Sequence, residues 1–214
     1  IRGMFSFVLL NEDNGNVQIY RDRAGEKPLY FSSSNTFVSF SSDLRVNRLL
    51  EGFDSTISQE SLGMYLRYGY VPSPMSIYES SFKLLAGSRI HLNLKTLNLK
   101  KALKLTQFKS LNNIEINSWW ELPPIEKKRL TYEDAKDQLK EVLLSATKMQ
   151  QISDVPIGTF LSGGIDSSLI TSLISQNTSN IKCFNIGFEF SNFDESIFAQ
   201  KISEHLGLRM ENLT

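Results

Sequence analysis

Apolar and polar residues alternate or cluster in a way that divides this chain into a strand-rich first part and a mixed second part. Short apolar or alternating runs predict strands, because a period of two places every second side chain on one face of a sheet. Four such runs lie near the start, at 3–10, 17–20, after the charged turn 21–30, and at 36–41. Because polar turns separate them closely, we expect an antiparallel meander in which 3–10 is a buried strand.

Further along the first part, caps and alternating runs predict helices and more strands. Ser58 predicts the start of a helix that ends at Gly69, and Ser41-Ser42-Asp43 predicts a shorter helix through Leu50. The remaining elements are an alternating run at 89–94 in a hairpin with 97–105 and a polar loop over 104–117.

Strands and helices alternate in the second part. The prolines and the charged run of 123–130 predict a linker between two domains. Helical periodicity and caps predict a helix over 131–150. They predict two more helices, one after the buried strand expected at 157–161 and one after the strand expected at 181–188. Two strands joined by a crossover helix of this length are expected to be parallel. The predicted fold class is therefore α+β for the first part and α/β for the second.

Composition and charge narrow the class of protein without indicating a chemistry. The 214 residues carry 23 basic and 23 acidic side chains, and hydrophobic residues make up 41% of the sequence. This balance gives no reason to expect nucleic acid or a membrane as a partner, and no apolar run is long enough to span a bilayer. The single cysteine, Cys183, excludes an intrachain disulfide and fits a reducing compartment. Its apolar neighbours predict a buried packing residue.

The residues with the clearest chemistry lie where the strand 157–161 turns into the next helix. Ser162-Gly163-Gly164-Ile165-Asp166-Ser167-Ser168 combines glycines and hydroxyl groups at a helix N-terminus. Unpaired N–H groups and the helix dipole favour an anion there, and glycine lets the backbone approach it closely. The serine hydroxyls add donors, so phosphate is the simplest ligand. Asp166 would repel bare phosphate, which predicts a cation such as Mg²⁺ between them.

Other interpretations of this turn compete with anion binding. A Walker-type phosphate loop needs a lysine after its last glycine, and none follows Gly164. A hydrolase nucleophile elbow needs glycine two residues before its serine, but Phe160 occupies that position before Ser162. An ordinary strand–helix turn capped by serines stays open on these residues alone.

Two stretches resemble the glutamine-hydrolysing asparagine synthetase family. The turn 162–168, with Ser153-Asp154-Val155-Pro156 before it, resembles the pyrophosphate-binding loop of the ATP-pyrophosphatase superfamily, and of that family in particular. Gly3-Met4-Phe5-Ser6-Phe7, together with Arg21-Asp22-Arg23 and Lys27-Pro28-Leu29-Tyr30, is similar to the late part of a class II glutaminase domain. The resemblance implies that a strand at Trp119, Trp120 and Leu122 closes that domain. From the residues alone, we interpret the charged turn 21–30 as a solvated loop in which Asp22 and Glu26 form salt bridges.

The resemblance implies a domain organisation. Residues 1–122 would be the C-terminal part of an antiparallel-sheet glutaminase domain of the N-terminal-nucleophile fold, and 123–130 would be the linker. Residues 131–214 would be the N-terminal part of a parallel α/β domain of the ATP-pyrophosphatase, or adenine nucleotide α-hydrolase-like, type. The family's nucleophile is an N-terminal cysteine that this sequence lacks, so no catalytic residue is assigned. We therefore expect a fragment of a longer protein that shows neither glutaminase nor synthetase activity by itself.

The resemblance also implies a reaction and a set of binding residues. The family joins aspartate to AMP with release of pyrophosphate, and ammonia from glutamine then displaces AMP to give asparagine. The implied roles are binding of the pyrophosphate of ATP by Ser162, Gly163, Gly164, Asp166, Ser167 and Ser168, binding of Mg²⁺ by Asp166, and contact with adenine by Phe160 and Ile186. Aspartate, glutamine and ATP are the implied small-molecule substrates. The resemblance also implies a cytoplasmic enzyme whose full-length form can be a homodimer.

Two other functions stay open. An enzyme of the same architecture, such as a β-lactam synthetase-like enzyme, would act on another carboxylate, whose pocket would lie beyond Thr214. A non-catalytic nucleotide-binding module would use the same turn without any reaction. Analysis of the products made from aspartate, glutamine and ATP would separate these functions.

Overall fold

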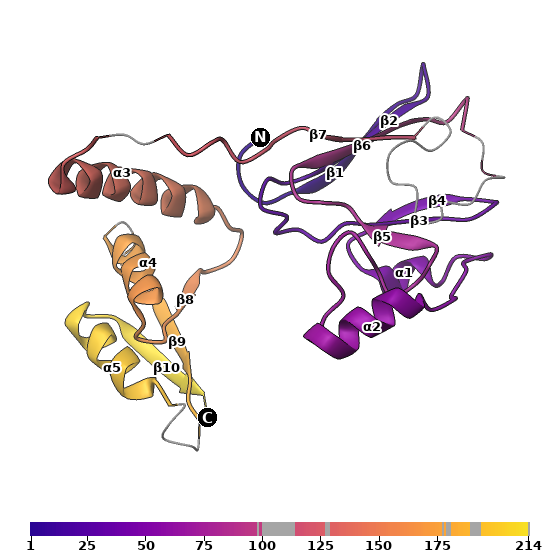
Figure 1. The fold of residues 1–214 in the computed structure, drawn as a ribbon. Helices are drawn as coiled ribbons and strands as arrows, with labels where there is room; N and C mark the ends of the chain where they lie inside the picture. Colours follow the sequence, from indigo (N-terminus) through magenta and orange to yellow (C-terminus); the bar gives the residue numbers. More distant parts are fainter. Residues whose placement is uncertain are drawn as a thin grey trace. The chain divides into compact units, whose positions relative to one another are not determined.

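The chain folds into two compact units, Ile1–Ile125 and Glu126–Thr214, which are described separately (Figure 1). A computed structural model describes residues 1–97, 99, 114–126, 129–176, 178, 181–188 and 194–213. Nearly all of the strand expected at 97–105 and of the loop expected at 104–113 lies outside the described residues, as do Lys127 and Lys128 of the expected linker. No helix in these described ranges is long and apolar enough to cross a membrane.

The described strands of the first unit form two antiparallel sheets (Figure 1). The larger sheet has the strand order β1-β2-β6-β7, with bounds β1 Ser6–Asn11, β2 Asn16–Arg21, β6 Ser88–Asn93 and β7 Ile114–Ser118. The smaller sheet has the order β4-β3-β5, with bounds β3 Tyr30–Ser33, β4 Val38–Ser41 and β5 Ser81–Lys83. Buried side chains from both sheets, among them Ile19, Phe31, Phe82 and Ile90, form one hydrophobic cluster that stabilises the unit.

The expected meander is wrong, because the chain changes sheets between β2 and β3. The strands β1 and β2 form a hairpin, whereas β3 pairs with β4 and β5 in the smaller sheet. The second partner of β2 is β6, and in that register Ile19 lies opposite Ile90. Both isoleucines are fully buried. The pairing of β2 with β6 is therefore favoured because it places the apolar side chains of two strands, distant in sequence, on the same buried face of the sheet.

The strand β1 lies at an edge of its sheet in the described part of the chain, so the expectation that it is buried is wrong. It pairs with β2 on one side, and Val8, Leu9 and Leu10 are 46%, 55% and 51% exposed. Apolar composition predicted the strand correctly, but it does not show whether a second layer covers that strand.

A strand also occupies the end of the segment for which a polar loop was expected. The strand β7 pairs with β6, and its residues Ile114 and Ile116 pack on the hydrophobic cluster. The apolar residues Ile114 and Ile116 alternate with polar ones at the end of a polar, Asn-rich stretch, so the strand was not recognised from the sequence. Trp119 and Trp120, which were expected within a strand, follow β7, and their N–H groups donate to the carbonyl oxygen of Gly87 over 2.8 and 3.1 Å. They therefore end the strand.

The described part of the first unit also contains the capped helices α1 (Leu44–Asn47) and α2 (Gln59–Tyr68). The Ser58 hydroxyl accepts a hydrogen bond from the N–H of Ser61, and Gly69 ends α2 with a φ of +77°. Both predicted caps of α2 are confirmed, since a positive φ favours glycine at that position.

The second unit is built around a parallel sheet with the strand order β10-β9-β8 (Figure 1). In chain order its elements are α3 Tyr132–Gln150, β8 Gly158–Phe160, α4 Ile165–Ser175, β9 Lys182–Ile186, α5 Ser196–His205 and β10 Arg209–Leu213. The strand β9 pairs in parallel with both neighbours, which confirms the predicted parallel arrangement. The chain thus has the mixed α/β character expected from its sequence.

One face of this parallel sheet is packed, whereas the opposite face is exposed among the described residues. On the packed face, Cys183, Leu161 and Ala199 are almost completely buried and belong to one cluster with Ile174 of α4. On the opposite face Phe160 is 77% exposed. The expectation of a buried strand at 157–161 is therefore wrong for one of its faces, because within β8 only Thr159 is buried.

Candidate functional site

The predicted anion-binding turn lies between the end of β8 and the first turn of α4. The N–H of Leu161 donates to the carbonyl oxygen of Phe184 over 2.8 Å, which extends the sheet by one bond and fixes the entry to the turn. Gly163 then adopts a φ of +80°, and a Cβ atom there would lie 2.5 Å from Cβ of Phe198 and 2.7 Å from N of Ala199. The turn therefore needs glycine twice over, for its conformation and for its close contact with α5.

Two of the predicted serines bond within the turn. Oγ of Ser162 lies 3.0 Å from Oγ of Ser167, and it accepts a hydrogen bond from the N–H of Gly164 over 3.3 Å. The Ser167 hydroxyl accepts from the N–H of Ser162 over 3.3 Å and donates to the carbonyl oxygen of Gly164 over 3.2 Å. These bonds pre-form the turn, so a ligand would meet an ordered backbone rather than a flexible loop.

Other groups of the turn keep hydrogen-bonding capacity. Gly164 is the N-cap of α4 and is exposed, and no side chain caps the helix there. The first amides of a helix have no partner within it. The buried Oγ of Ser168 has no hydrogen-bond partner among the described residues. Of the three serines predicted to bind the anion, Ser168 is therefore the one whose hydroxyl makes no hydrogen bond within the described part of the turn.

The carboxylate of Asp166 lies on the exposed side of the first turn of α4. In the described ranges, no group of three or more His, Cys, Asp or Glu side chains is placed to hold a metal ion. Mg²⁺ is commonly held by one or two carboxylates together with substrate phosphates, so a preformed protein cage is not required. The donor set fits Mg²⁺ bound jointly with a nucleotide.

The predicted adenine contacts lie at the same edge of the sheet as the turn. Phe160 ends β8 directly before it, and Ile186 ends β9 on the same exposed face. Their side chains are 77% and 56% exposed, and Phe188 beyond β9 is exposed as well. The structure therefore brings the turn and these apolar side chains together at the carboxyl ends of parallel strands, where open α/β sheets bind ligands.

A polar network beside the turn was missed by the sequence analysis. The amide Nδ2 of Asn185, which is buried, donates to Oγ of Ser196 over 2.7 Å and to Oδ1 of Asn212 over 2.8 Å. The Ser196 hydroxyl donates to Asp194 over 2.5 Å, and its bonds to Asp194 lower the pKa of that carboxyl. This network fixes the first turn of α5, which also packs on Gly163 through Phe198 and Ala199. The presence of Asn185 within a mostly apolar strand was the sequence signal that could have predicted a buried polar network here.

The charged turn of the first unit is held by Asp22 through backbone N–H groups, so the predicted salt bridge of Asp22 is wrong, whereas Arg23, Glu26 and Lys27 are exposed as expected of a solvated loop. Asp22 is 1% exposed, and its carboxylate accepts hydrogen bonds from the N–H groups of Glu26 and Lys27, each over 2.9 Å, and of Phe5 over 3.4 Å. Burial would raise the pKa of Asp22, but these donors outweigh it and lower the pKa. Arg21 donates to carbonyl oxygens of Gly25 and Lys27 over 2.6 and 2.8 Å.

Comparisons with known proteins match both units. The glutamine amidotransferase domain family matches residues 1–102, and the asparagine synthase family matches residues 138–214. A relative from Methanocaldococcus jannaschii named putative asparagine synthetase [glutamine-hydrolyzing] 2 is 30% identical over 210 residues. The chain belongs to the glutamine-hydrolysing asparagine synthetase family. Within this family, the turn 162–168 and the charged turn 21–30 fall in different matched domains.

The curated relatives are much longer than this chain. The M. jannaschii alignment covers 95% of the chain and 37% of the relative. Asparagine synthetase [glutamine-hydrolyzing] 1 of Bacillus subtilis is 29% identical over 214 residues, which is 100% of the chain and 31% of the relative. Amidase chry2 of Gibberella zeae is 27% identical over 226 residues, with 97% of the chain and 31% of the relative covered. The chain thus spans about a third of the length of the curated relatives it matches.

Proposed function

We propose that this chain supplies parts of two linked catalytic units in an enzyme that makes asparagine from aspartate, glutamine and ATP. The observation that carries the proposal is the pre-formed glycine turn, in which Gly163 is seated against α5 and the start of α4 is open to a ligand. The order of the two matched families along the chain supports the same reaction. The other products would be glutamate, AMP and pyrophosphate, formed through a β-aspartyl-AMP intermediate.

In this proposal the turn stabilises the pyrophosphate that leaves ATP. Fixed N–H and hydroxyl donors need no reorganisation when negative charge develops on the leaving group. The donors would be the backbone N–H groups of Gly163 and Gly164 and the hydroxyl of Ser168, and the hydroxyls of Ser162 and Ser167 would exchange their bonds within the turn for bonds to the phosphate. Asp166 would hold Mg²⁺, which neutralises phosphate charge when bound. Phe160 and Ile186 would contact the adenine ring from the same edge of the sheet.

The proposal extends to the organisation of the whole protein. Residues 1–122 would belong to an N-terminal-nucleophile glutaminase domain that releases ammonia from glutamine, and 131–214 to a nucleotide α-hydrolase-like domain, joined by 123–130. The dense bonding of Asp22 to backbone N–H groups supports a scaffolding role for the charged turn. Resemblance to the family supports a cytoplasmic enzyme and a homodimer of the full-length protein.

The test is a paired measurement on the full-length protein that contains this chain. A variant with Ser162→Ala and Asp166→Ala should lose pyrophosphate release, because the donors and the metal ligand act on ATP alone. Hydrolysis of glutamine should be largely retained, because it needs only the other domain. Loss of both activities, with an unchanged thermal unfolding midpoint, would contradict this division of roles, as would unchanged pyrophosphate release.

A second candidate is an enzyme of the same architecture that acts on another carboxylate. The similarity to a protein named amidase chry2 over 97% of the chain supports keeping this candidate. Product analysis separates the two, because asparagine appears from aspartate, glutamine and ATP only in the first case. Formation of AMP and pyrophosphate with a different carboxylate, and none with aspartate, would establish the second.

A further inference from the structure

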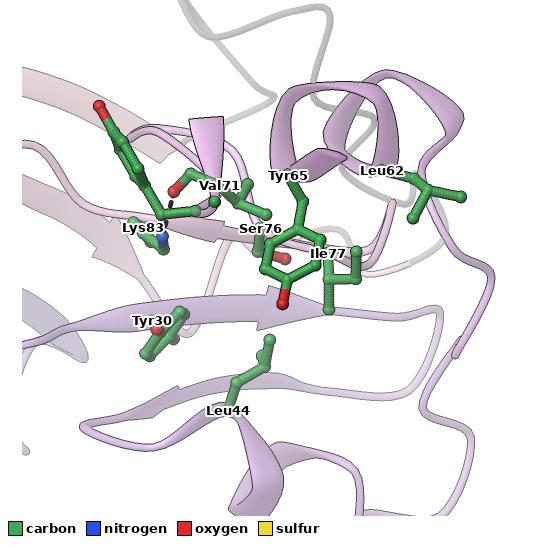
Figure 2. A pocket seen from close by; sticks show the side chains of 10 residues that line it. Tyr30, Leu44, Leu62, Tyr65, Val71, Ser76, Ile77 and Lys83 are labelled. Carbon is green, nitrogen blue, oxygen red and sulfur yellow. Dashed lines mark hydrogen bonds between the residues drawn. The ribbon is translucent and has the colours of Figure 1, made fainter. Parts of the chain in front are cut away.

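A pocket in the first unit is lined by none of the residues proposed to bind ATP, Mg²⁺ or adenine. It has a volume of about 510 Å³ and is formed by β3, α1, α2, the segment 69–77 and the end of β5 (Figure 2). Its walls are the apolar or aromatic side chains of Tyr30, Leu44, Leu62, Tyr65, Tyr70, Val71 and Ile77, with Ser76 and Lys83 between them. We propose that this pocket binds a small aromatic carboxylate, with the carboxylate at the Lys83 ammonium and the ring between the tyrosines.

Lys83 supplies the charge among the described residues that line the pocket. Its Nζ donates to the carbonyl oxygen of Val71 over 2.5 Å (Figure 2), and an ammonium has three donor hydrogens. Partial burial lowers the pKa of Lys83, and the nearby Arg21 guanidinium lowers it further. The ammonium thus sits in a locally positive, partly dehydrated place where a carboxylate gains a charge-assisted hydrogen bond.

The walls of the pocket are held in place before any ligand binds. The backbone N–H of Lys83 donates to the carbonyl oxygen of Pro74 over 2.8 Å, which fastens the segment 69–77 to β5. Ser76 is buried and bonds to the backbone of Tyr78. The opposite wall is α2, which has a cap at each end. Pre-formed walls reduce the entropic cost of binding.

The aromatic side chains set the shape of the ligand. Figure 2 shows the Tyr65 ring directed from α2 toward the sheet and Leu44, with Tyr30 and Lys83 to one side of it. Tyr65 and Tyr70 are 51% and 61% exposed and form the rim, whereas Ser76 and half-buried Lys83 lie deeper. A flat ring fits between apolar walls with its acidic group at the deeper end, and aromatic pairs prefer such offset or edge-on contacts.

The test compares two ligands that differ in charge and almost nothing else. Indole-3-acetate and indole-3-acetamide are titrated into the purified protein by calorimetry at neutral pH. The acid should bind about tenfold more tightly than the amide, since a charge-assisted hydrogen bond is roughly twice as strong as a neutral one. Equal affinity of the two, or no binding of the acid, would overturn the proposal.

Variants locate the ligand in this pocket. Lys83→Met keeps the apolar stem and should remove the preference for the acid, whereas Lys95→Met is the matched control. Nζ of Lys95 also donates to a backbone carbonyl, that of Asp13 over 2.6 Å, but on an exposed surface outside the pocket. Leu62→Trp should fill the pocket and weaken both ligands at least tenfold. Unchanged binding in Leu62→Trp, or equal losses in the two lysine variants, would place the ligand elsewhere and overturn the proposal.

Discussion

Single residues stabilise each unit through contacts with the backbone of a distant segment. Gly163 lies against the backbone of α5, and Asp22 accepts from the N–H of distant Phe5 as well as from those of Glu26 and Lys27 within the charged turn. Neither contact is visible as a hydrophobic period. Both residues can be tested by a substitution that changes very few atoms.

Replacement of Gly163 by alanine should destabilise the second unit. A left-handed φ costs an alanine about 1–2 kcal/mol, and the clash with Phe198 and Ala199 adds about 1–3 kcal/mol of overpacking. Gly207→Ala is the matched control, because Gly207 has a φ of +66° but no atom within 4 Å of the added Cβ. Urea unfolding measures both variants, and equal losses would show that the contact with α5 contributes nothing.

Stability of the first unit should depend on the ionised carboxylate of Asp22. Its pKa is lowered in the folded state, so its contribution is fully present above the ordinary carboxyl pKa of about 4. That contribution is lost as the pH falls through the lower, folded-state value. Asp22→Asn should cost about 1–3 kcal/mol at neutral pH and flatten this acid dependence.

Urea midpoints between pH 2 and 6 measure the effect of Asp22→Asn. The exposed Asp13→Asn serves as the control and should leave the acid dependence unchanged. An Asp22→Asn variant that keeps the acid dependence of the parent protein would assign it to other carboxyl groups.

At the scale of elements, the start of α5 is fixed by side chains of two strands. Asn185 of β9 donates hydrogen bonds to Ser196, the first residue of α5, and to Asn212 of β10. The side chain of Asn212 also lies within hydrogen-bonding distance of the Ser196 hydroxyl. Because Gly163 packs on this same first turn of α5, the network also supports the predicted pyrophosphate turn. The network was not predicted, since its members are separated in the sequence and only the sheet register brings them together.

Coupling within this network can be measured by a double-mutant cycle. Asn185→Ala and Ser196→Ala should each lower the unfolding free energy of the second unit. Their combined effect should fall short of the sum by about 0.5–3 kcal/mol, because either change alone breaks the shared bond. Ser175→Ala, whose hydroxyl bonds to the carbonyl oxygen of Ser172 within α4, is the control partner and should combine additively with Asn185→Ala.

At the scale of the whole molecule, the two units have separate cores. The cluster around Phe31 belongs to the first unit, and the cluster around Leu161 belongs to the second. The chain's two tryptophans, Trp119 and Trp120, both lie in the first unit. Tryptophan fluorescence therefore reports on the first unit, whereas far-ultraviolet ellipticity is dominated by the longer helices of the second.

These two signals should separate when one core is weakened. Phe31→Ala should lower the unfolding free energy of the first unit by about 3–5 kcal/mol and shift the fluorescence transition to lower urea. The ellipticity transition should move much less. Leu161→Ala should do the reverse. Coincident shifts of both signals in either variant would show that the units unfold as one cooperative body.

Local sequence patterns by themselves determined the parts of this protein whose signals lie within a few residues of one another. They gave the caps of α2, the alternation of strand and helix in the second unit, and the glycine turn at 162–168. Its role in binding ATP, Mg²⁺ and pyrophosphate stays a prediction. The glutamine amidotransferase domain was predicted only from the family resemblance, which rests on the short stretches 3–7, 21–23 and 27–30.

Only the tertiary structure decided which strands pair and which faces are covered. It placed β2 beside β6, revealed β7 among polar residues, left β1 at an edge, and exposed Phe160 on an open face. It also assembled the Asn185 network and the Lys83 pocket from segments far apart in the chain. The physical reason is that hydrophobic periodicity shows which residues can share a face, whereas the partner of that face is chosen by packing across the whole unit.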